Sequence, residues 1–374
     1  MINKKRLIQL TRKLIQIDSQ NPPGDERKIA RFVADYLKRL GVSSRVYEFK
    51  KNRLNIIAVI KGRDPKSLLI TPHLDTVPAG RSWTVDPLAA KIKGNKIYGL
   101  GATDCKCNIS IALEAINSFI EDGVVLPYTL IFSATADEET GSDLGLIPLL
   151  NRNILKPDAA VVLDADDFDI IVSQKGLMHI TVKITGKRAH GAYPWRGINA
   201  IDIAINAIKE IKSIKFSRIR HKYLRPPTIN VGTIRGGDKV NIVADWCEFE
   251  LDFRFLPGSY APEIISKVKK ILSSYTKKYK LEIQGIQQPY NIEEAHALVS
   301  CLKKAARKVK VSARVKGSEG ATVITFFQHK NIPAIATGFG YGGSAHTADE
   351  FVKIDRLHKG ALLLEEFLKN FNFN

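Results

Sequence analysis

The chain has 374 residues, of which 44% are hydrophobic and 25% are charged. This balance is typical of a soluble globular protein and excludes a disordered, collagen-like or membrane-spanning chain, while the length predicts two or three domains of about 150 residues each. The 57 Lys and Arg residues exceed the 38 Asp and Glu residues, which leaves a formal net charge of +19. Such a charge suits nucleic acid, an anionic surface or an acidic substrate, and it does not choose among them.

The cysteines and the N-terminal segment indicate the compartment. Only four cysteines occur, and two of them lie two positions apart, which does not resemble a disulfide framework. We therefore expect reduced thiols in a cytoplasmic protein. Near the N-terminus, Leu7, Leu10 and Leu14 recur at helical spacing between polar residues, which predicts an amphipathic first helix rather than a targeting sequence. No apolar run reaches the roughly 18 residues of a membrane span, so no membrane association is expected.

The first part of the chain alternates between helical and strand-like patterns. Near-continuous apolar strands between helices predict a sheet that is covered on both faces, as in an α/β domain. The expected elements, in chain order, are a helix at 26–40, strands at 54–60 and 67–72, a helix at 107–122, and strands at 128–135 and 159–164.

The pattern changes after residue 174. Strands and helices then follow in the order β-α-β-β-α-β, with the helices at 197–214 and 261–279, which describes a ferredoxin-like α+β unit. Helical patterns at 293–308 and 355–370 resume the larger domain. The sequence therefore predicts one α/β domain, residues 1–174 and 288–374, with a smaller domain inserted at 175–287.

Histidines and acids gather in five places, four of which directly follow apolar strands. Taken singly, each has an ordinary explanation as a loop histidine, an N-cap aspartate or a solvated acid. Taken together, two histidines and several carboxylates at strand ends suit zinc or a similar divalent ion at the edge of an open α/β sheet. The five places are His73 with Asp75, Asp104, the run Asp137-Glu138-Glu139, Asp164 and His346.

Two other patterns do not indicate a site. The stretch from Gly338 to Gly343 satisfies G-x-G-x-x-G, but it lies near the end of the chain, with no ribose-binding acid in a following βαβ unit. The run 303–316 is strongly basic but reads as a solvated helix face, without the interleaved aromatic residues of a nucleic-acid site. We expect neither a dinucleotide cofactor nor a nucleic-acid partner.

Seven stretches carry a resemblance to a known family, and they occur in family order over essentially the whole chain. On these stretches the sequence resembles the M20 family of metallopeptidases and deacylases, in its acetylornithine deacetylase and succinyl-diaminopimelate desuccinylase branch. They read QIDSQNPPGDE, TPHLDTVP, WTVDPLAAKIKGNKIYGLGATDCK, ADEETGS, AHGAYPWRGINAI, VNIVADWCEFELDFR and AHTADEFV.

The resemblance implies a zinc-peptidase-like catalytic domain, a mixed sheet flanked by helices, that holds two divalent ions. Zinc is the expected metal, and cobalt or manganese would substitute for it. Asp104 would bridge the two ions. His73 and Asp164 would complete one position, and Glu139 and His346 would complete the other.

The resemblance also implies the catalytic roles. Glu138 would be the general base that takes a proton from the attacking water and then passes it to the leaving amine, while the metal polarises the amide carbonyl. Asp75 would hold the second ring nitrogen of His73. The remaining acid of the triplet, Asp137, receives no role.

The inserted domain would then be a lid that also forms a homodimer. His190 matches a histidine that reaches the partner subunit's active site in the family. Asn241 and Arg254 match lid positions that contact substrate in the family, and the guanidinium of Arg254 would pair bidentately with a substrate carboxylate.

Three departures from the family pattern stand out. The family usually continues the bridging aspartate with Met-Lys-Gly, whereas this chain has Cys105-Lys106-Cys107. Cys-x-Cys is not a usual zinc spacing, so we interpret both thiols as small packing residues. Asp164 is a shorter ligand than the glutamate common in this branch. The segment 317–327 lacks the usual Gly-Thr-Asp, which bears on recognition of the substrate side chain.

The expected function is metal-dependent removal of an N-acyl group, of acetyl or succinyl type, from an amino acid. An M20 exopeptidase, either a dipeptidase or a carboxypeptidase acting on short peptides, would need the same metals, so the motifs do not separate the two. A different class, a metal-free basic binding protein on the same fold, stays open at this point. The substrate would in either enzyme be a small N-acyl amino acid or a short peptide.

Overall fold

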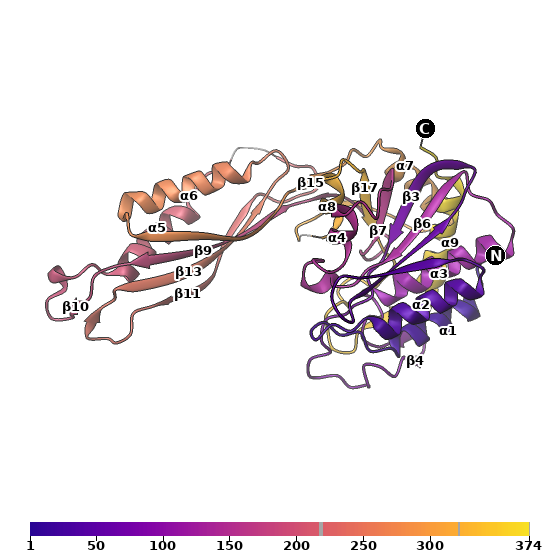
Figure 1. Ribbon diagram of the computed structural model, residues 1–374, viewed down its shortest axis with the longest axis horizontal. Coiled ribbons are helices and arrows are strands. Elements are labelled where there is room, and N and C mark those ends of the chain that lie inside the picture. Colours follow the sequence, from indigo (N-terminus) through magenta and orange to yellow (C-terminus); the bar gives the residue numbers. More distant parts are fainter. Residues whose placement is uncertain (217–219, 321, 374) are drawn as a thin grey trace. The chain divides into compact units, whose positions relative to one another are not determined.

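The computed structural model describes residues 1–216, 220–320 and 322–373 (Figure 1). Its contacts divide the chain into two compact units. The first unit comprises Met1–Val172, Ile292–Lys316 and Phe326–Asn374, and the second comprises Ser173–Asn291 and Gly317–Thr325. The sequence had placed 317–325 in the larger domain. The segment groups with the second unit because it hydrogen bonds to the chain around Lys175, whose amide donates to the Ser318 carbonyl at 3.1 Å.

The first unit is built on a mixed sheet, whose last strand, Tyr290–Asn291, belongs to the second unit. Its central strands β6, β3, β7 and β17 run parallel to one another. Their apolar, mostly buried side chains explain why the sequence reads as continuous hydrophobic runs there. The strand order is β1 (Ser44–Glu48), β2 (Leu54–Ile60), β6 (Tyr128–Ala134), β3 (Asp64–Thr71), β7 (Ala159–Leu163), β17 (Ala334–Thr337), β8 (Ile170–Gln174) and β15 (Tyr290–Asn291), with β16 (Val315–Ser318) paired to β8.

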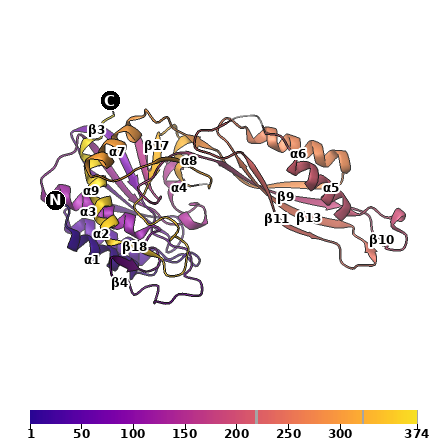
Figure 2. The ribbon, with the colours of Figure 1, turned by 180° about the vertical axis from the view of Figure 1, so that it is seen from behind.

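Helices pack beside this sheet (Figures 1 and 2). Helix α3 is buried along almost its whole length and packs between α1 and α9, while α7 packs on α9 and α2 packs on β2. The helices are α1 (Lys4–Ile15), α2 (Arg27–Arg39), α3 (Lys106–Glu121), α4 (Leu146–Asn151), α7 (Ala297–Lys308), α8 (Ile324–Gln328) and α9 (Ile354–Asn370). A small separate sheet contains β4 (Lys91–Lys93), β5 (Lys96–Tyr98) and β18 (Phe351–Lys353).

The second unit follows the expected β-α-β-β-α-β order. Its antiparallel sheet has the strand order β11 (Thr228–Gly236), β13 (Trp246–Phe255), β9 (Gly176–Thr185) and β14 (Tyr279–Gln287). Alternate residues of β9 and β13 are buried in one core with α5 (Ala200–Lys212) and α6 (Ala261–Tyr275). The short strands β10 (Ala189–His190) and β12 (Ile242–Val243) form a separate pair. Within the described residues, no helix is both long and apolar enough to cross a membrane.

Candidate metal centre

The parallel strands bring the predicted site residues to one edge of the sheet. His73 lies two residues beyond β3, Glu138 and Glu139 form a short 3-10 turn beyond β6, and Asp164 directly follows β7. The carboxyl ends of neighbouring parallel strands meet at the same edge, which is where open α/β sheets bind ligands. An isolated bridge between His73 and Thr135 extends the pairing of β3 with β6 to this point.

Asp104 joins the two predicted histidines. Its Oδ1 lies 2.8 Å from His73 Nε2, and its Oδ2 lies 3.2 Å from His346 Nε2. His346 Nε2 is also 3.2 Å from Glu139 Oε1, and His73 Nε2 is 3.9 Å from Asp164 Oδ1. Each carboxylate oxygen of Asp104 therefore faces a different histidine, which is the arrangement expected of a carboxylate that bridges two cations.

The ring of His73 is held from its second nitrogen. Nδ1 lies 3.0 Å from the main-chain carbonyl of Asp75, which can only accept, so Nδ1 carries a proton. The Asp75 carboxylate lies farther away, with Oδ1 at 3.6 Å from Nδ1, beyond a normal hydrogen bond. With Nδ1–H fixed in this way, Nε2 is the nitrogen that faces Asp104 and is available to a metal.

The Asp75 carboxylate instead positions the loop that carries the two glutamates. Its oxygens accept from the main-chain amides of Glu138, at 3.1 Å, and Glu139, at 3.2 Å. Asn21 Nδ2 donates to the same carboxylate at 2.9 Å. Burial opposes ionisation of Asp75, but its interactions with His73, Asn21 and the Glu138 amide together outweigh burial and lower its pKa. Asp75 therefore couples the His73 strand to the Glu138 loop.

Asp137, for which the sequence offered no role, fixes the start of that loop. It is buried with a left-handed backbone, φ 67°, and its carboxylate accepts from Arg53 Nη2 at 2.8 Å, Thr140 Oγ1 at 2.6 Å and the Leu144 amide at 2.9 Å. Arg53 Nε also pairs with buried Glu26 at 2.8 Å. The buried network thus holds the start of the loop that carries Glu138 and Glu139.

We expect Arg53→Met to destabilise the fold strongly. It would leave the carboxylates of Glu26 and Asp137 buried without their cation, and removing one partner of a buried pair typically costs about 3–5 kcal/mol of the free energy of unfolding. Arg27→Met is the matched control, because it removes only the exposed pair with Asp25 and should leave stability unchanged within error. Urea unfolding measures both, and equal midpoints for the two variants would contradict the role given to the network.

Glu350 is a further supporting residue to which the sequence assigned no role. Its buried carboxylate accepts from the main-chain amides of Gly101, Thr103 and Asp104 at 2.7–2.9 Å. Burial raises the pKa of Glu350 to about 7 despite these three donors. The glutamate therefore fixes the loop that presents Asp104, and the only sequence signal for it was its place in the stretch AHTADEFV.

The pKa shifts of the site residues indicate an excess of negative charge that cations would balance. Hydrogen bonds from His346 and His73 outweigh the effect of burial and lower the pKa of Asp104. Burial and the nearby charge of Asp104 raise the pKa of Asp164 to about 7, and burial together with Asp164 raises the pKa of Glu138 well above its usual range. Hydrogen bonds to Asp104 and Glu139 raise the pKa of His346 to about 10. Without a metal, the acids hold or attract protons that divalent ions would replace.

The donor atoms also lie at metal-binding spacing. In the described part of the chain, His73, Glu138 and Asp164 form one group, Asp104, Glu139 and His346 form another, and the donor atoms within each group lie within 4.8 Å of one another. A third group combines His73, Asp104 and Cys105. Imidazole nitrogens and carboxylate oxygens are the ligands of zinc and similar ions. The residues present therefore fit a pair of divalent cations.

The three predicted lid residues belong to the second unit. His190 and Asn241 lie close together because β10 pairs with β12, and the Gly191 amide donates to the Asn241 carbonyl at 2.8 Å. Arg254 forms a two-point ion pair with Asp252 of its own strand, at 2.8 Å and 3.1 Å. A substrate carboxylate would have to compete with Asp252 for this guanidinium.

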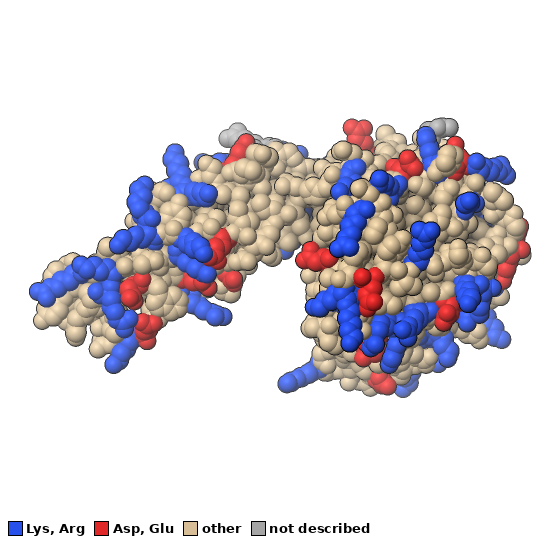
Figure 3. Space-filling model, in the orientation of Figure 1, with Lys and Arg blue, Asp and Glu red and all other residues tan. Residues whose placement is uncertain are grey.

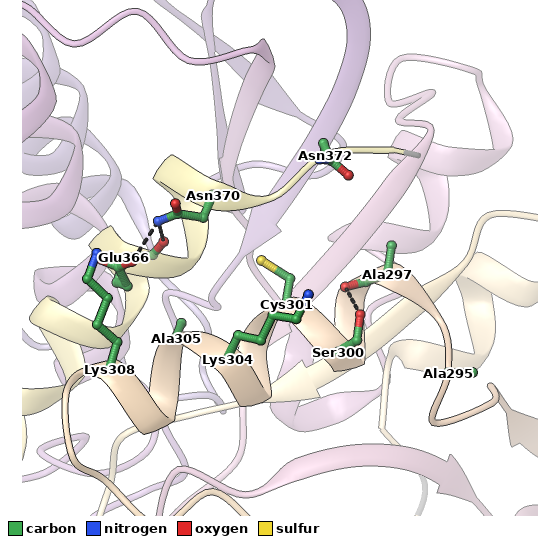
Figure 4. A pocket seen from close by; sticks show the side chains of 10 residues that line it. All are labelled: Ala295, Ala297, Ser300, Cys301, Lys304, Ala305, Lys308, Glu366, Asn370 and Asn372. Carbon is green, nitrogen blue, oxygen red and sulfur yellow. Dashed lines mark hydrogen bonds and ion pairs between the residues drawn. The ribbon is translucent and has the colours of Figure 1, made fainter.

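A cavity in the first unit lies away from these ligands. It has a volume of about 510 Å³ and lies beside α7 and the end of α9 (Figure 4). Its lining includes Cys301 and the ion pair between Lys308 Nζ and Glu366 Oε1, 2.7 Å apart. None of the predicted metal ligands lines it, so its volume gives no reason to place the chemistry there.

Comparisons with known proteins agree with this arrangement. The model of peptidase family M20/M25/M40 matches residues 69–370. An acetylornithine deacetylase from Proteus mirabilis (strain HI4320) is 28% identical over 385 residues, which cover 97% of this chain and 96% of the relative. The crystal structure of an aminopeptidase from Bacillus cereus has a TM-score of 0.84 at 24% identity and covers 98% of each chain. A tripeptidase from Staphylococcus aureus has a TM-score of 0.82 at 27% identity and covers 99% of this chain and 98% of that one.

The family match covers most of the chain, and it includes Glu138 and all five predicted metal ligands, His73, Asp104, Glu139, Asp164 and His346. The fold is shared over nearly the full length of the solved structures. The resemblance recognised in the sequence motifs is therefore confirmed. The chain belongs to peptidase family M20/M25/M40 and is a hydrolase of amide bonds.

Proposed function

We propose that the protein removes an N-acyl group, of acetyl or succinyl type, from an amino acid and uses two divalent metal ions per chain, zinc in the first place. The observation that carries the proposal is the Asp104 carboxylate, which faces His73 with one oxygen and His346 with the other, next to Glu138. The acetylornithine deacetylase from Proteus mirabilis, similar over nearly its whole length, supports the acyl amino acid as substrate.

Each of the chain's site residues would have its own role in amide hydrolysis. Bound divalent ions would polarise the amide carbonyl and lower the pKa of a water molecule. Glu138 would take the proton of the attacking water and return it to the leaving amine. Asp75 holds both the His73 ring and the amides of the Glu138 loop. The raised pKa of Glu138 suits a group that must hold a proton between these two transfers.

We also propose that the second unit acts as lid and dimerisation domain in a cytoplasmic homodimer. His190 would help to stabilise the oxyanion in the partner subunit's site, and Asn241 and Arg254 would bind substrate. Large apolar side chains near His190, those of Tyr193 and Trp195, are exposed in the single chain, which suits a surface that another copy covers. The cysteines are free thiols in this structure, as a reducing compartment requires.

An exopeptidase is the second candidate function. The similarity to a tripeptidase at 27% identity favours it specifically, and the metal centre would serve both reactions. The metal-free binding protein is not supported, because the donor groups of both metal positions are complete. The basic charge gives it little support either, since Lys and Arg are spread and mixed with acids over the face seen in Figure 3.

A substrate panel tests the proposal. Zinc- or cobalt-loaded protein is offered N-acetylornithine, N-succinyl-diaminopimelate, other N-acyl amino acids, dipeptides and tripeptides, and amine release is measured. We expect one N-acyl amino acid to be cleaved with the highest kcat/KM. A dipeptide or tripeptide as the best substrate would establish the exopeptidase instead. No cleavage by a protein that binds no metal would refute both.

A further inference from the structure

The thiol of Cys105 lies among the donor atoms of the metal centre. Its Sγ, one donor atom of His73 and one of Asp104 all lie within 4.8 Å of one another. The side chain is fully buried. Since Cys105 directly follows the bridging aspartate, its sulfur belongs to the same short segment that presents Asp104 to both histidines.

A hydrogen bond fixes the direction of this thiol. Cys105 Sγ donates to the main-chain carbonyl of Leu163 at 3.0 Å, and Leu163 is the residue immediately before Asp164. The sulfur therefore lies between the end of β7, which carries Asp164, and the ring of His73. These are two of the residues proposed for one metal position.

Cys107 shows that this placement is specific. Its Sγ donates to the carbonyl of Thr103 at 3.1 Å, and it is in none of the donor groups found in the described residues. The sequence interpretation treated both thiols as packing residues. The structure separates them, because only Cys105 faces the metal centre.

The chemistry of the position gives the thiol a role. His73, Asp104 and Asp164 offer one nitrogen and two oxygens, and zinc takes up a further ligand readily. A sulfur ligand favours thiophilic ions such as Zn²⁺ and Co²⁺, whereas Mn²⁺ and Mg²⁺ prefer oxygen.

We propose that Cys105 is a sulfur ligand of the metal position formed by His73 and Asp164, and that it makes this position selective for thiophilic divalent ions. The proposal rests on the proposed function, because it requires the metal centre. On binding, the metal–sulfur bond replaces the hydrogen bond to Leu163, and the thiol proton leaves to solvent. The selectivity is thus built into the residue that follows the bridging aspartate.

Cobalt provides the test, because a thiolate bound to Co²⁺ gives a charge-transfer band in the near ultraviolet. The full chain carries Cys301→Ser throughout, since Cys301 lines the cavity of Figure 4 and offers cobalt another thiol. Metal-free protein is titrated with Co²⁺ while bound cobalt is counted. We expect the band in this parent and in Cys107→Ser, and its loss in Cys105→Ser with cobalt still bound.

Competition between metals gives a second readout. For Cys105→Ser we expect the affinity for Zn²⁺ at this position to fall by more than the roughly 10- to 100-fold lost when a supporting group of a zinc site is removed, because a direct ligand is lost, while the affinity for Mn²⁺ changes little. Cys105→Ala, with its fold checked by circular dichroism, replaces the serine variant if a buried hydroxyl disturbs folding.

The outcomes separate this inference from the proposed function. Two bound Co²⁺ ions without the band in the parent would overturn the sulfur ligand and leave the metal-dependent hydrolase standing. A band that survives in Cys105→Ser and Cys105→Ala would overturn it as well, because the sulfur would come from elsewhere. A parent that binds no Co²⁺ or Zn²⁺ would overturn both proposals together.

Discussion

Replacing Glu138 by glutamine should reduce kcat by about 10²- to 10⁴-fold, the contribution typical of a positioned general acid–base. Glutamine keeps the size of the side chain but neither accepts the proton of water nor returns it to the amine. The main-chain amide of residue 138 still donates to Asp75, so the loop keeps its anchor. KM for the substrate identified in the panel should change much less than kcat.

Asp143→Asn is the matched control for this variant. Asp143 is exposed, follows the same loop, and is in none of the donor groups found in the described residues. It should keep its kcat, and both variants should bind two metal ions when the metal content is measured. If Glu138→Gln binds both metals and keeps more than about a tenth of the parent kcat, Glu138 is not the general base.

Most of the architecture could be predicted from the pattern of hydrophobic residues along the chain. The continuous apolar runs at β3, β6 and β7 predicted buried strands, and the β-α-β-β-α-β order of the second unit appears as expected. The fold prediction is confirmed by the family match and the solved relatives. Patterning reports burial along one element at a time, so it did not show that the segment 317–325 joins the second unit through hydrogen bonds to residues near Lys175.

The sequence pointed to the candidate ligands of the site but not to the residues that hold them in place. Ligand types and their places after strands pointed to His73, Asp104 and Asp164, and the structure brings these side chains together. Glu350, Arg53 and Asp137 act through contacts between segments far apart in the sequence. No local pattern marks such residues, because a buried ion pair is recognised only when both partners are placed.

The same limit applies to the two thiols. Cys105 and Cys107 look equivalent in the sequence, yet one donates to Leu163 beside the metal centre and the other to Thr103. Their different directions follow from the start of α3, where the chain leaves the Asp104 loop and enters the helix. Spacing alone argued against a zinc motif, because such motifs describe pairs of ligands at fixed spacing and not a single thiol beside histidine and carboxylate from distant segments.

Asp104→Asn should strongly weaken binding of both metal ions together. Asparagine keeps the size of the side chain, but it loses the negative charge and replaces one of the two oxygens with an amide nitrogen. The oxygens facing His73 and His346 therefore cannot both serve as ligands. The loss of affinity should exceed the roughly 10- to 100-fold that a supporting residue contributes. Calorimetric titration with Zn²⁺ measures it, with His346→Gln as the control.

The control should behave differently because His346 belongs to one position only. His346→Gln leaves His73, Asp104 and Asp164 in place, so one ion should still bind. If Asp104→Asn also keeps one tightly bound ion, the aspartate does not bridge the two positions. If His346→Gln keeps two ions of unchanged affinity, His346 is not a ligand.

The pH dependence of metal affinity gives an independent check on the same arrangement. Hydrogen bonds to Asp104 and Glu139 raise the pKa of His346 to about 10 in the metal-free protein, so at neutral pH a metal must displace a proton from this ring. Zinc affinity of the parent, expressed for free Zn²⁺ after the competition of hydroxide for the ion is taken into account, should therefore rise with pH and level off only near pH 10. Asp104→Asn removes the largest of the interactions that raise this pKa. Any residual affinity for zinc in the variant should consequently level off at a lower pH, and an unchanged profile would show that Asp104 does not control the protonation of His346.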